Sequence, residues 1–470
     1  MNREVTSRLP TGPPPAFSSS GETAMPDRWW FAFDDAALNQ QIAVSLDGSF
    51  TLAAALERLR AARAVTRREA SDLWPDLDGV DDANSTFSTD GDEATRLVLG
   101  LEASYQVDLW GQIQSRVDAE RLRASATHAD YHAIALTLSA DVARTWYSLI
   151  EAHAQLELLD RQIETNRKGL QGQQARFEVG LIRLPDLLRQ EQLVESTLEQ
   201  AVVVQSRIAV LEHLLAVLQG RPPQDATYEP GEDLPGLPPL PDTGLPAELL
   251  DRRPDIRREF LALQAADRDL AAAITSQYPR ISLTSSLTNV AEHPEDLFRE
   301  WFFSIGSQLV APLIDGGQRR AEIDRTASVV YQRFNQYGET VINAYREVED
   351  SLIREQYLIA RIERLDNQTK LASQSSTLLR EQYLIGDADY LDVLSAITAE
   401  QSLQRETLSA RLELVRTRIA LYLALAGSFA PRSPLPPLGP PPAVEPAPAV
   451  GPPVAVELLP APSPENDRDE

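Results

Sequence analysis

The spacing of apolar residues predicts two very long helices. Between Gly111 and Gly180 almost no residue breaks a helix, and apolar side chains recur every seven residues. This spacing is typical of a coiled-coil seam. About 65 residues at a rise of 1.5 Å each give a rod on the order of 100 Å. The seam residues are Leu149, Leu156, Ile163, Leu170 and Phe177.

A second long helix is predicted from about Gln318 to Gly386, with apolar seam residues at the same spacing. Each long helix is followed by a return helix of about half its length, at about 187–218 and 391–425. Glycine is the residue that most cheaply turns the chain between helices. Gly180 and Gly386 therefore read as the tips of two helical hairpins.

The two tips share one pattern at an offset of 206 residues, the difference between 386 and 180. An aromatic residue stands three positions before each glycine, and an aspartate stands six positions after it. The pairs are Phe177 with Asp186 and Tyr383 with Asp392. Repetition at a fixed offset indicates that the two halves of the chain are equivalent units of one architecture.

Period-two alternation predicts two strands in each half, at about 76–110 and about 280–313. From Leu97 to Leu109 apolar residues face one way and mostly polar residues the other, which is typical of a strand with two unlike faces. Four such strands in one open sheet leave exposed edges. We therefore expect several chains to contribute strands to one closed barrel, with lipid outside and water inside.

These elements suggest the following organisation. Residues 1–25 are expected to be disordered, and 26–220 form a first repeat of one helix, two strands and a long hairpin. A proline-rich connector at 221–246 leads to the second repeat at 247–428, and a disordered Pro/Ala-rich tail occupies 429–470.

Composition excludes several functions. The formal net charge of −26 argues against a nucleic-acid partner, and the absence of cysteine excludes disulfides and thiol catalysis. The sequence contains no run of about 18 apolar residues, so we expect no membrane-spanning helix. His128 and His132 stand four residues apart, a spacing that can bind metal, but no third ligand accompanies them. We therefore expect no enzyme activity, no cofactor and no metal site.

Several sequence blocks resemble the outer-membrane efflux protein family, and more narrowly the lipoprotein-type outer-membrane factors of resistance-nodulation-division pumps. The similarity extends over about residues 26 to 428. It rests on the blocks 26–30 (PDRWW), 245–256 (LPAELLDRRPDI) and 312–318 (PLIDGGQ), and on the two aromatic-x-x-Gly tips.

The resemblance implies a mainly α fold with a membrane β-barrel portion. The expected assembly is a homotrimer with a shared 12-stranded barrel in outer-membrane lipid and a long α-helical coiled-coil tunnel in the periplasm. It also implies a passive exit duct for drugs or other small solutes. Its expected partners are a periplasmic adaptor (membrane fusion) protein and an inner-membrane resistance-nodulation-division transporter.

The resemblance also assigns roles to residues. Asp387, Asp389 and Asp392 are expected to form an acidic periplasmic gate, whose charges would repel one another when closed. Both tips are expected to contact the adaptor. The contact residues are Phe177, Val179, Gly180, Leu181, Tyr383, Ile385 and Gly386.

A structural role is expected for the block Arg252, Arg253, Pro254 and Asp255. Proline suits the first turn of a helix, and aspartate suits its positive end.

Two features depart from the family pattern. The segment 72–93 should contain the first membrane strand, yet it holds seven Asp or Glu residues beyond Asp72 and no basic residue. An export signal and a lipidated Cys are not visible, so we expect that the true start lies upstream or that the chain represents a processed form. The alternatives are a soluble or periplasmic coiled-coil scaffold or adaptor, and a protein-secretion outlet of the same fold.

Overall fold

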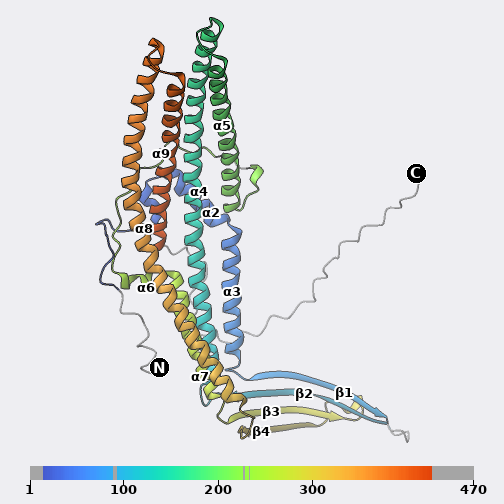
Figure 1. The fold of residues 1–470 in the computed structure, drawn as a ribbon. Helices are drawn as coiled ribbons and strands as arrows, with labels where there is room; N and C mark the ends of the chain where they lie inside the picture. Colours follow the sequence, from blue (N-terminus) through green and yellow to red (C-terminus); the bar gives the residue numbers. More distant parts are fainter. Residues whose placement is uncertain (1–13, 88–92, 226–227, 232, 426–470) are drawn as a thin grey trace, which may run out of the picture. The chain divides into compact units, whose positions relative to one another are not determined.

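The computed structural model describes residues 14–87, 93–225, 228–231 and 233–425. Two helical hairpins and one antiparallel sheet dominate it (Figure 1). The predicted tail at 429–470, and residues 1–13 of the predicted disordered N-terminus, lie outside the described residues. So do Asp90 and Asp92 of the acidic segment.

The two long helices agree closely in length, as the duplication predicts. Helix α4 spans Gln112–Glu178 and α8 spans Gln318–Ile385. Each begins after a glycine in the left-handed region, Gly111 with φ 71° and Gly317 with φ 89°. The return helices are α5, Leu184–Leu218, and α9, Tyr390–Leu425. Each long helix packs along its own return helix, and α4 also packs on α9 (Figure 1).

Shorter elements complete the helical region. They are η1 (Trp29–Phe33), α2 (Ala36–Gly48), α3 (Phe50–Ser71), η2 (Pro223–Asp225), η3 (Pro246–Glu248), α6 (Leu249–Arg252) and α7 (Pro254–Thr275). The largest apolar core lies where η1 and α2 meet α4 and α9. Trp29 is fully buried there and stacks on Tyr422, and its Nε1 donates a hydrogen bond to Ser139 Oγ at 3.0 Å.

One four-stranded sheet has the order β1-β2-β3-β4, and every neighbouring pair is antiparallel. Its strands are β1 (Asp76–Phe87), β2 (Glu93–Val107), β3 (Arg280–Ala291) and β4 (Trp301–Val310), with the short helix η4 (Pro294–Asp296) between the last two. Strands from both halves of the sequence therefore share one sheet. Within the described residues, the outer edges of β1 and β4 pair with no other strand.

The pairing register assigns each side chain to a face, because residues directly opposite one another point the same way. Leu99 pairs with Asp81 on one side and with Asn289 on the other. The shared face is largely apolar, while the opposite face carries Ser, Thr, Gln and Glu. The large apolar residues of the shared face are Leu77, Phe87, Leu97, Leu99, Leu101, Tyr105, Val107, Ile281, Leu283, Leu287, Trp301, Phe303, Ile305 and Leu309.

The register also places the carboxylates of β1. Asp76, Asp78 and Asp82 lie on the polar face, in line with Ser104, Glu102 and Val98 of β2. Asp81 lies on the apolar face, opposite Leu99. Three of the four carboxylates on this strand therefore lie on the polar face, and one lies on the apolar face.

Helix α5 has two apolar rows. The row Leu187, Val194, Ala201, Ile208 and Leu215 is buried. A second row, Val203, Val210 and Val217, is exposed. Within the described residues, α5 is the one helix whose length and composition would allow it to cross a membrane, contrary to the expectation from the sequence. Its close packing along α4 identifies it instead as one member of a helical hairpin.

The expectation that residues 1–25 are disordered is wrong for residues 14–25. Phe17 is buried against the ring of Tyr345, and Gly21 N donates to Pro241 O at 3.0 Å. Thr23 forms a bridge to Pro241 in the connector. These contacts arise because folding brings the connector beside a segment that is too polar to suggest order by itself.

Candidate functional site at the hairpin tips

The two tips have the same backbone geometry. Gly180 and Gly386 adopt φ values of 73° and 86°, in the left-handed region that disfavours other residues. Leu181 N donates to Arg176 O and Asp387 N donates to Gln382 O, both at 2.8 Å. Such bonds satisfy the carbonyl groups that a helix end leaves free. The glycines thus end both long helices in the same way.

The second tip is acidic and exposed. Asp387 follows Gly386 directly, Asp389 lies two residues further on, and Asp392 lies in the first turn of α9. All three side chains are exposed, and no ion pair joins them to a described residue. Acidic side chains are favourable at the start of a helix, which stabilises this arrangement in a single chain.

The first tip is apolar and exposed. Val179 and Leu181 are 69% and 68% exposed, and Phe177 is 39% exposed. Tyr383 is only partly exposed at the second tip, whereas Ile385 is 81% exposed. The residues expected to contact an adaptor are therefore accessible in the single chain, with Tyr383 the least so.

The aligned aspartates Asp186 and Asp392 differ in environment. Asp186 is buried and pairs with Arg189 at 3.0 Å and with Arg183 at 3.5 Å. At the position of Arg183 the second tip carries Asp389. Asp392 therefore lacks the arginine that Asp186 has at this position. Its side chain is exposed, whereas that of Asp186 is buried between two arginines.

A polar network joins the two hairpins just behind the tips. Tyr383 Oη donates to Gln173 Oε1 at 3.1 Å, and the Arg176 guanidinium lies 4.5 Å from the centre of the Tyr383 ring. Tyr390 Oη donates to Gln190 Oε1. The network therefore connects α8 and α9 with α4 and α5.

The environment of Tyr390 disfavours its ionised form. Burial, assisted by neighbouring Tyr383, raises the pKa of Tyr390 to about 12. Its hydroxyl therefore stays protonated and remains a donor to Gln190 at physiological pH.

The interface between the hairpins continues as a seam of amide side chains. Gln401 Nε2 donates to Asn166 Oδ1 at 2.9 Å, and Gln155 Nε2 donates to Arg405 O at 2.8 Å. Gln162 Nε2 donates to Gln404 Oε1 at 2.9 Å. Contacts of this kind between α4 and α9 are directional and replaceable by water, unlike a packed apolar seam.

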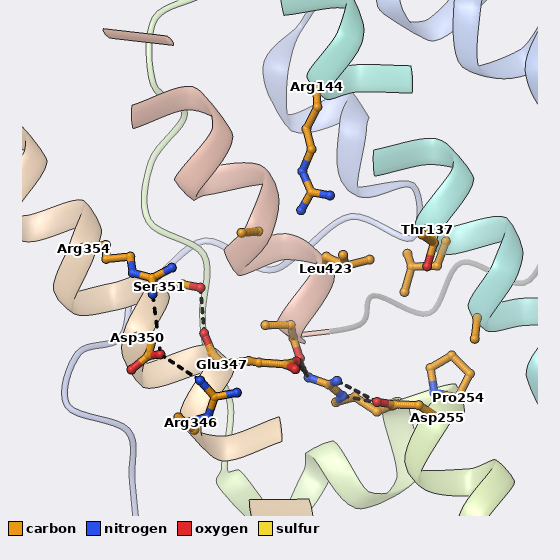
Figure 2. A pocket seen from close by; sticks show the side chains of 15 residues that line it. Thr137, Arg144, Pro254, Asp255, Arg346, Glu347, Asp350, Ser351, Arg354 and Leu423 are labelled. Atoms are coloured by element: carbon orange, nitrogen blue, oxygen red, sulfur yellow. Dashed lines mark hydrogen bonds and ion pairs between the residues drawn. The ribbon is translucent and has the colours of Figure 1, made fainter. Parts of the chain in front are cut away.

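Three residues of the predicted block, Arg253, Pro254 and Asp255, line a cavity of about 430 Å³ that lies far from the tips (Figure 2). Pro254 begins α7, and Arg253 is buried. Arg253 pairs with Asp255 at 2.7 Å and with Glu347 at 2.8 Å. Burial alone would lower the pKa of Arg253, but the two carboxylates raise it overall. These contacts support the predicted structural role.

Arg252 is less constrained than Arg253. It forms an exposed ion pair with Glu248 at 2.8 Å, in the turn before α7. Exposed pairs of this kind contribute little to stability.

Sequence reasoning missed the network residues Gln173, Arg176, Gln190 and Tyr390. The internal alignment offered one signal, because Tyr383 and Tyr390 stand where the first repeat has Phe177 and Leu184. These two hydroxyl groups, present in only one repeat, lie on either side of the Gly386 turn, Tyr383 on α8 and Tyr390 on α9. Hydroxyl groups of this kind require partners when buried. Which partners they meet depends on how the hairpins pack.

The histidine pair is close enough to interact directly. His128 Nε2 and His132 Nε2 lie 3.2 Å apart. Burial and the charges of Arg63 and Arg257 lower the pKa of His128. Within the described residues, no group of three or more His, Cys, Asp or Glu is placed to hold a metal.

Comparison with known families identifies the architecture. The family described as "Outer membrane efflux protein" matches residues 42–221 and 245–427, which is most of the chain. The chain belongs to the outer membrane efflux protein family. It is accordingly an efflux channel protein of the outer membrane, in a family that serves transport. The resemblance inferred from the sequence is confirmed.

Individual relatives extend over nearly the whole efflux protein. The pyoverdine export outer membrane protein OpmQ of Pseudomonas aeruginosa is 26% identical, over 86% of this chain and 87% of its own. The cation efflux system protein CusC of Escherichia coli O6:H1 is 28% identical, over 85% of this chain and 88% of its own length. The solved outer-membrane channel OprN superposes with a TM-score of 0.81 at 26% identity. The superposition covers 92% of this chain and 97% of the OprN chain.

These findings support the channel and none of the alternative functions. The predicted fold class, with a long helical portion and four strands per chain, is confirmed. The match in two segments separated by the connector also follows the internal duplication.

Proposed function

We propose that this efflux protein works as a homotrimer whose shared barrel and helical tunnel form a passive exit duct. An inner-membrane resistance-nodulation-division transporter would drive export, joined to the duct by a periplasmic adaptor. Drugs or other small solutes would pass through it. The named relatives act in pyoverdine export and cation efflux, which supports an efflux role without identifying a substrate for this chain.

The open sheet carries this proposal. Its apolar face suits lipid, its polar face suits water, and its two edges have no partner within the described residues. Lipid offers no hydrogen bonds to an unpaired strand edge, so a membrane sheet must close on itself. Copies of β1 and β4 can supply the missing pairs to one another.

The number of copies follows from the need for a lumen. Two chains would give eight strands, and an eight-stranded barrel is about filled by its own side chains. Three chains would give a wider, twelve-stranded barrel. The trimer is therefore the smallest symmetric assembly that leaves room for solutes.

Exposed apolar rows on the hairpins support the same assembly. Val203, Val210 and Val217 lie exposed on α5, and Leu371, Leu378 and Ile385 lie exposed at the same seven-residue spacing on α8. Neighbouring copies could cover both rows with coiled-coil packing. A continuous helical tunnel would result.

We assign the acidic gate to Asp387, Asp389 and Asp392, and adaptor packing chiefly to the first tip. Three copies of the exposed second tip would gather nine carboxylates at the entrance. They would attract cations, and their repulsion would favour opening. Phe177, Val179 and Leu181 offer the apolar surface that an adaptor can cover, with Tyr383 and Ile385 contributing from the second tip.

Conductance of the purified full chain in planar bilayers tests the proposal. We expect heat-resistant trimers in detergent and channels that prefer cations. Asp387→Asn, Asp389→Asn and Asp392→Asn together should lower the cation preference several-fold, because the ring charge sets the local ion concentration. A matched variant neutralises three carboxylates of the first hairpin instead: Glu178→Gln, Glu191→Gln and Glu195→Gln.

The outcomes separate the parts of the proposal. A monodisperse protein that is soluble without detergent and does not conduct would overturn the channel assembly. Conduction with equal selectivity in both triple variants would retain the channel and reject the acidic gate.

A further inference from the structure

A cavity of about 440 Å³ lies between the two hairpins, lined on α4 from Thr165 to Arg176, about one to four helical turns behind Gly180. Its lining comes from α4, α5, α8 and α9, so both hairpins enclose it. Its volume lies in the range of pockets that hold small molecules. It is separate from the exposed carboxylates of the second tip, none of which lines it.

The lining is cationic although the chain as a whole is strongly acidic. Lys168, Arg176 and Arg380 line the cavity, and no Asp or Glu does. Lys168 is paired with Glu164 at 2.6 Å. Neither Arg176 nor Arg380 has a carboxylate within ion-pair distance among the described residues. Among the described residues, the cavity therefore has two arginine charges without a matching carboxylate.

Arg176 in particular has one guanidinium nitrogen without a hydrogen-bond partner among the described residues. Its Nη1 is buried and makes no hydrogen bond, although the guanidinium lies over the Tyr383 ring. A buried donor without a partner is costly, and a guanidinium offers paired donors that match a carboxylate. An anion in the cavity would satisfy it.

The remaining surface suits a planar ring. The Tyr383 and Tyr390 rings lie 5.3 Å apart at 50°. Gly172 also lines the cavity, and the space beside it is open, because a Cβ built there would meet no atom within 4 Å. Offset and inclined packing between aromatic rings is favourable.

We propose that this cavity is a binding site for a small aromatic carboxylate. Its carboxylate pairs with Arg176 and Arg380, and its ring packs beside Tyr383 and Tyr390. Such a ligand contacts α4 together with α8 and α9, and it thereby holds the hairpins in their present arrangement. The effect on gating rests on the proposed channel function, whereas binding does not.

Titration calorimetry of the full chain in detergent tests binding directly. Sodium 2-naphthoate should bind once per chain and saturate. The neutral 2-naphthamide, which has the same ring, should bind at least tenfold more weakly. Failure of naphthoate to saturate, or equal binding of the amide, would overturn the site.

Variants test the two halves of the site separately. Arg176→Gln should weaken naphthoate binding at least tenfold, and Arg380→Gln severalfold. Gly172→Leu should abolish it by filling the space for the ring while both arginines remain. Arg161→Gln, which changes an exposed arginine elsewhere on α4, should leave binding unchanged. Unchanged binding in Arg176→Gln or Gly172→Leu would place the ligand elsewhere and refute the proposal.

Conductance measurements test the consequence. Naphthoate should reduce channel opening in the wild type and have no effect on Gly172→Leu. If the wild type conducts and binds naphthoate without a change in opening, the cavity does not restrain the hairpins. If naphthoate binds but the wild type does not conduct, the site stands and the proposed channel function fails.

Discussion

The two hairpin tips have one backbone geometry and two chemistries. Gly180 and Gly386 end α4 and α8 with the same left-handed residue and the same hydrogen bonds. The residues that follow differ, with an apolar surface at the first tip and carboxylates at the second. A duplicated turn can therefore keep its geometry through one glycine while its side chains differ in charge and polarity.

Exchange of the two tips should have the largest effect. The exchange combines Leu181→Asp, Ile182→Ala and Arg183→Asp with Asp387→Leu, Ala388→Ile and Asp389→Arg. We expect export to fall to the level of cells that lack the protein, since each surface then faces the wrong neighbour. Drug susceptibility and dye efflux measure this, with heat-resistant trimers as the control for assembly. Full export by the exchanged protein would show that the tips are equivalent.

Neutralisation of the aligned aspartates should separate stability from conduction. Asp186→Asn should destabilise the first hairpin by about 1 kcal/mol, because Asp186 is buried and pairs with Arg183 and Arg189. Asp392→Asn, at an exposed position, should change stability by no more than about 0.5 kcal/mol. Thermal unfolding in detergent measures both. Equal losses would mean that the two environments do not differ in solution.

A smaller, pH-dependent difference should come from Tyr390, for which the first hairpin has Leu184. Burial raises the pKa of Tyr390 to about 12, whereas the pKa of an exposed tyrosine is about 10. A raised folded-state pKa gives stability that is present below the unfolded pKa and is lost as pH rises through the folded one. The second hairpin should therefore lose stability between about pH 10 and pH 12.

Tyr390→Phe tests this assignment. It should remove that loss and cost about 1 kcal/mol at neutral pH, through the bond to Gln190. Tyrosinate absorbance and thermal unfolding as a function of pH measure the two effects. Tyr357→Phe, at a position that is 68% exposed, is the control. An unchanged pH profile in Tyr390→Phe would assign the loss to another group.

Much of the architecture could be predicted from local patterns. The heptad spacing of α4 and α8, and Gly180 and Gly386 at their ends, follow from rules that act within a few residues. Period-two alternation likewise indicated strands with unlike faces. The sequence blocks that resemble the outer-membrane efflux protein family indicated a location in the outer membrane.

Other features depended on contacts between distant segments. The position of Asp81 on the apolar face becomes clear only from its pairing with Leu99. Residues 14–25 are ordered because Phe17 meets Tyr345 and Gly21 meets Pro241, more than 200 residues away. The composition of a short segment does not indicate which distant residues it will contact in the folded chain.

The amino-acid sequence by itself determined the duplication, the rods, the turns and the acidic character of the second tip, because each depends on local propensity or on a residue's own charge. The packing of the helices, in contrast, buries Asp186 beside Arg183 and Arg189 and leaves Asp392 exposed. It also decided that Tyr390 meets Gln190, and that Arg176 and Arg380 line a cavity to which no Asp or Glu contributes. These properties arise where two hairpins pack, and packing sets burial, pairing and hence the energy of each charge.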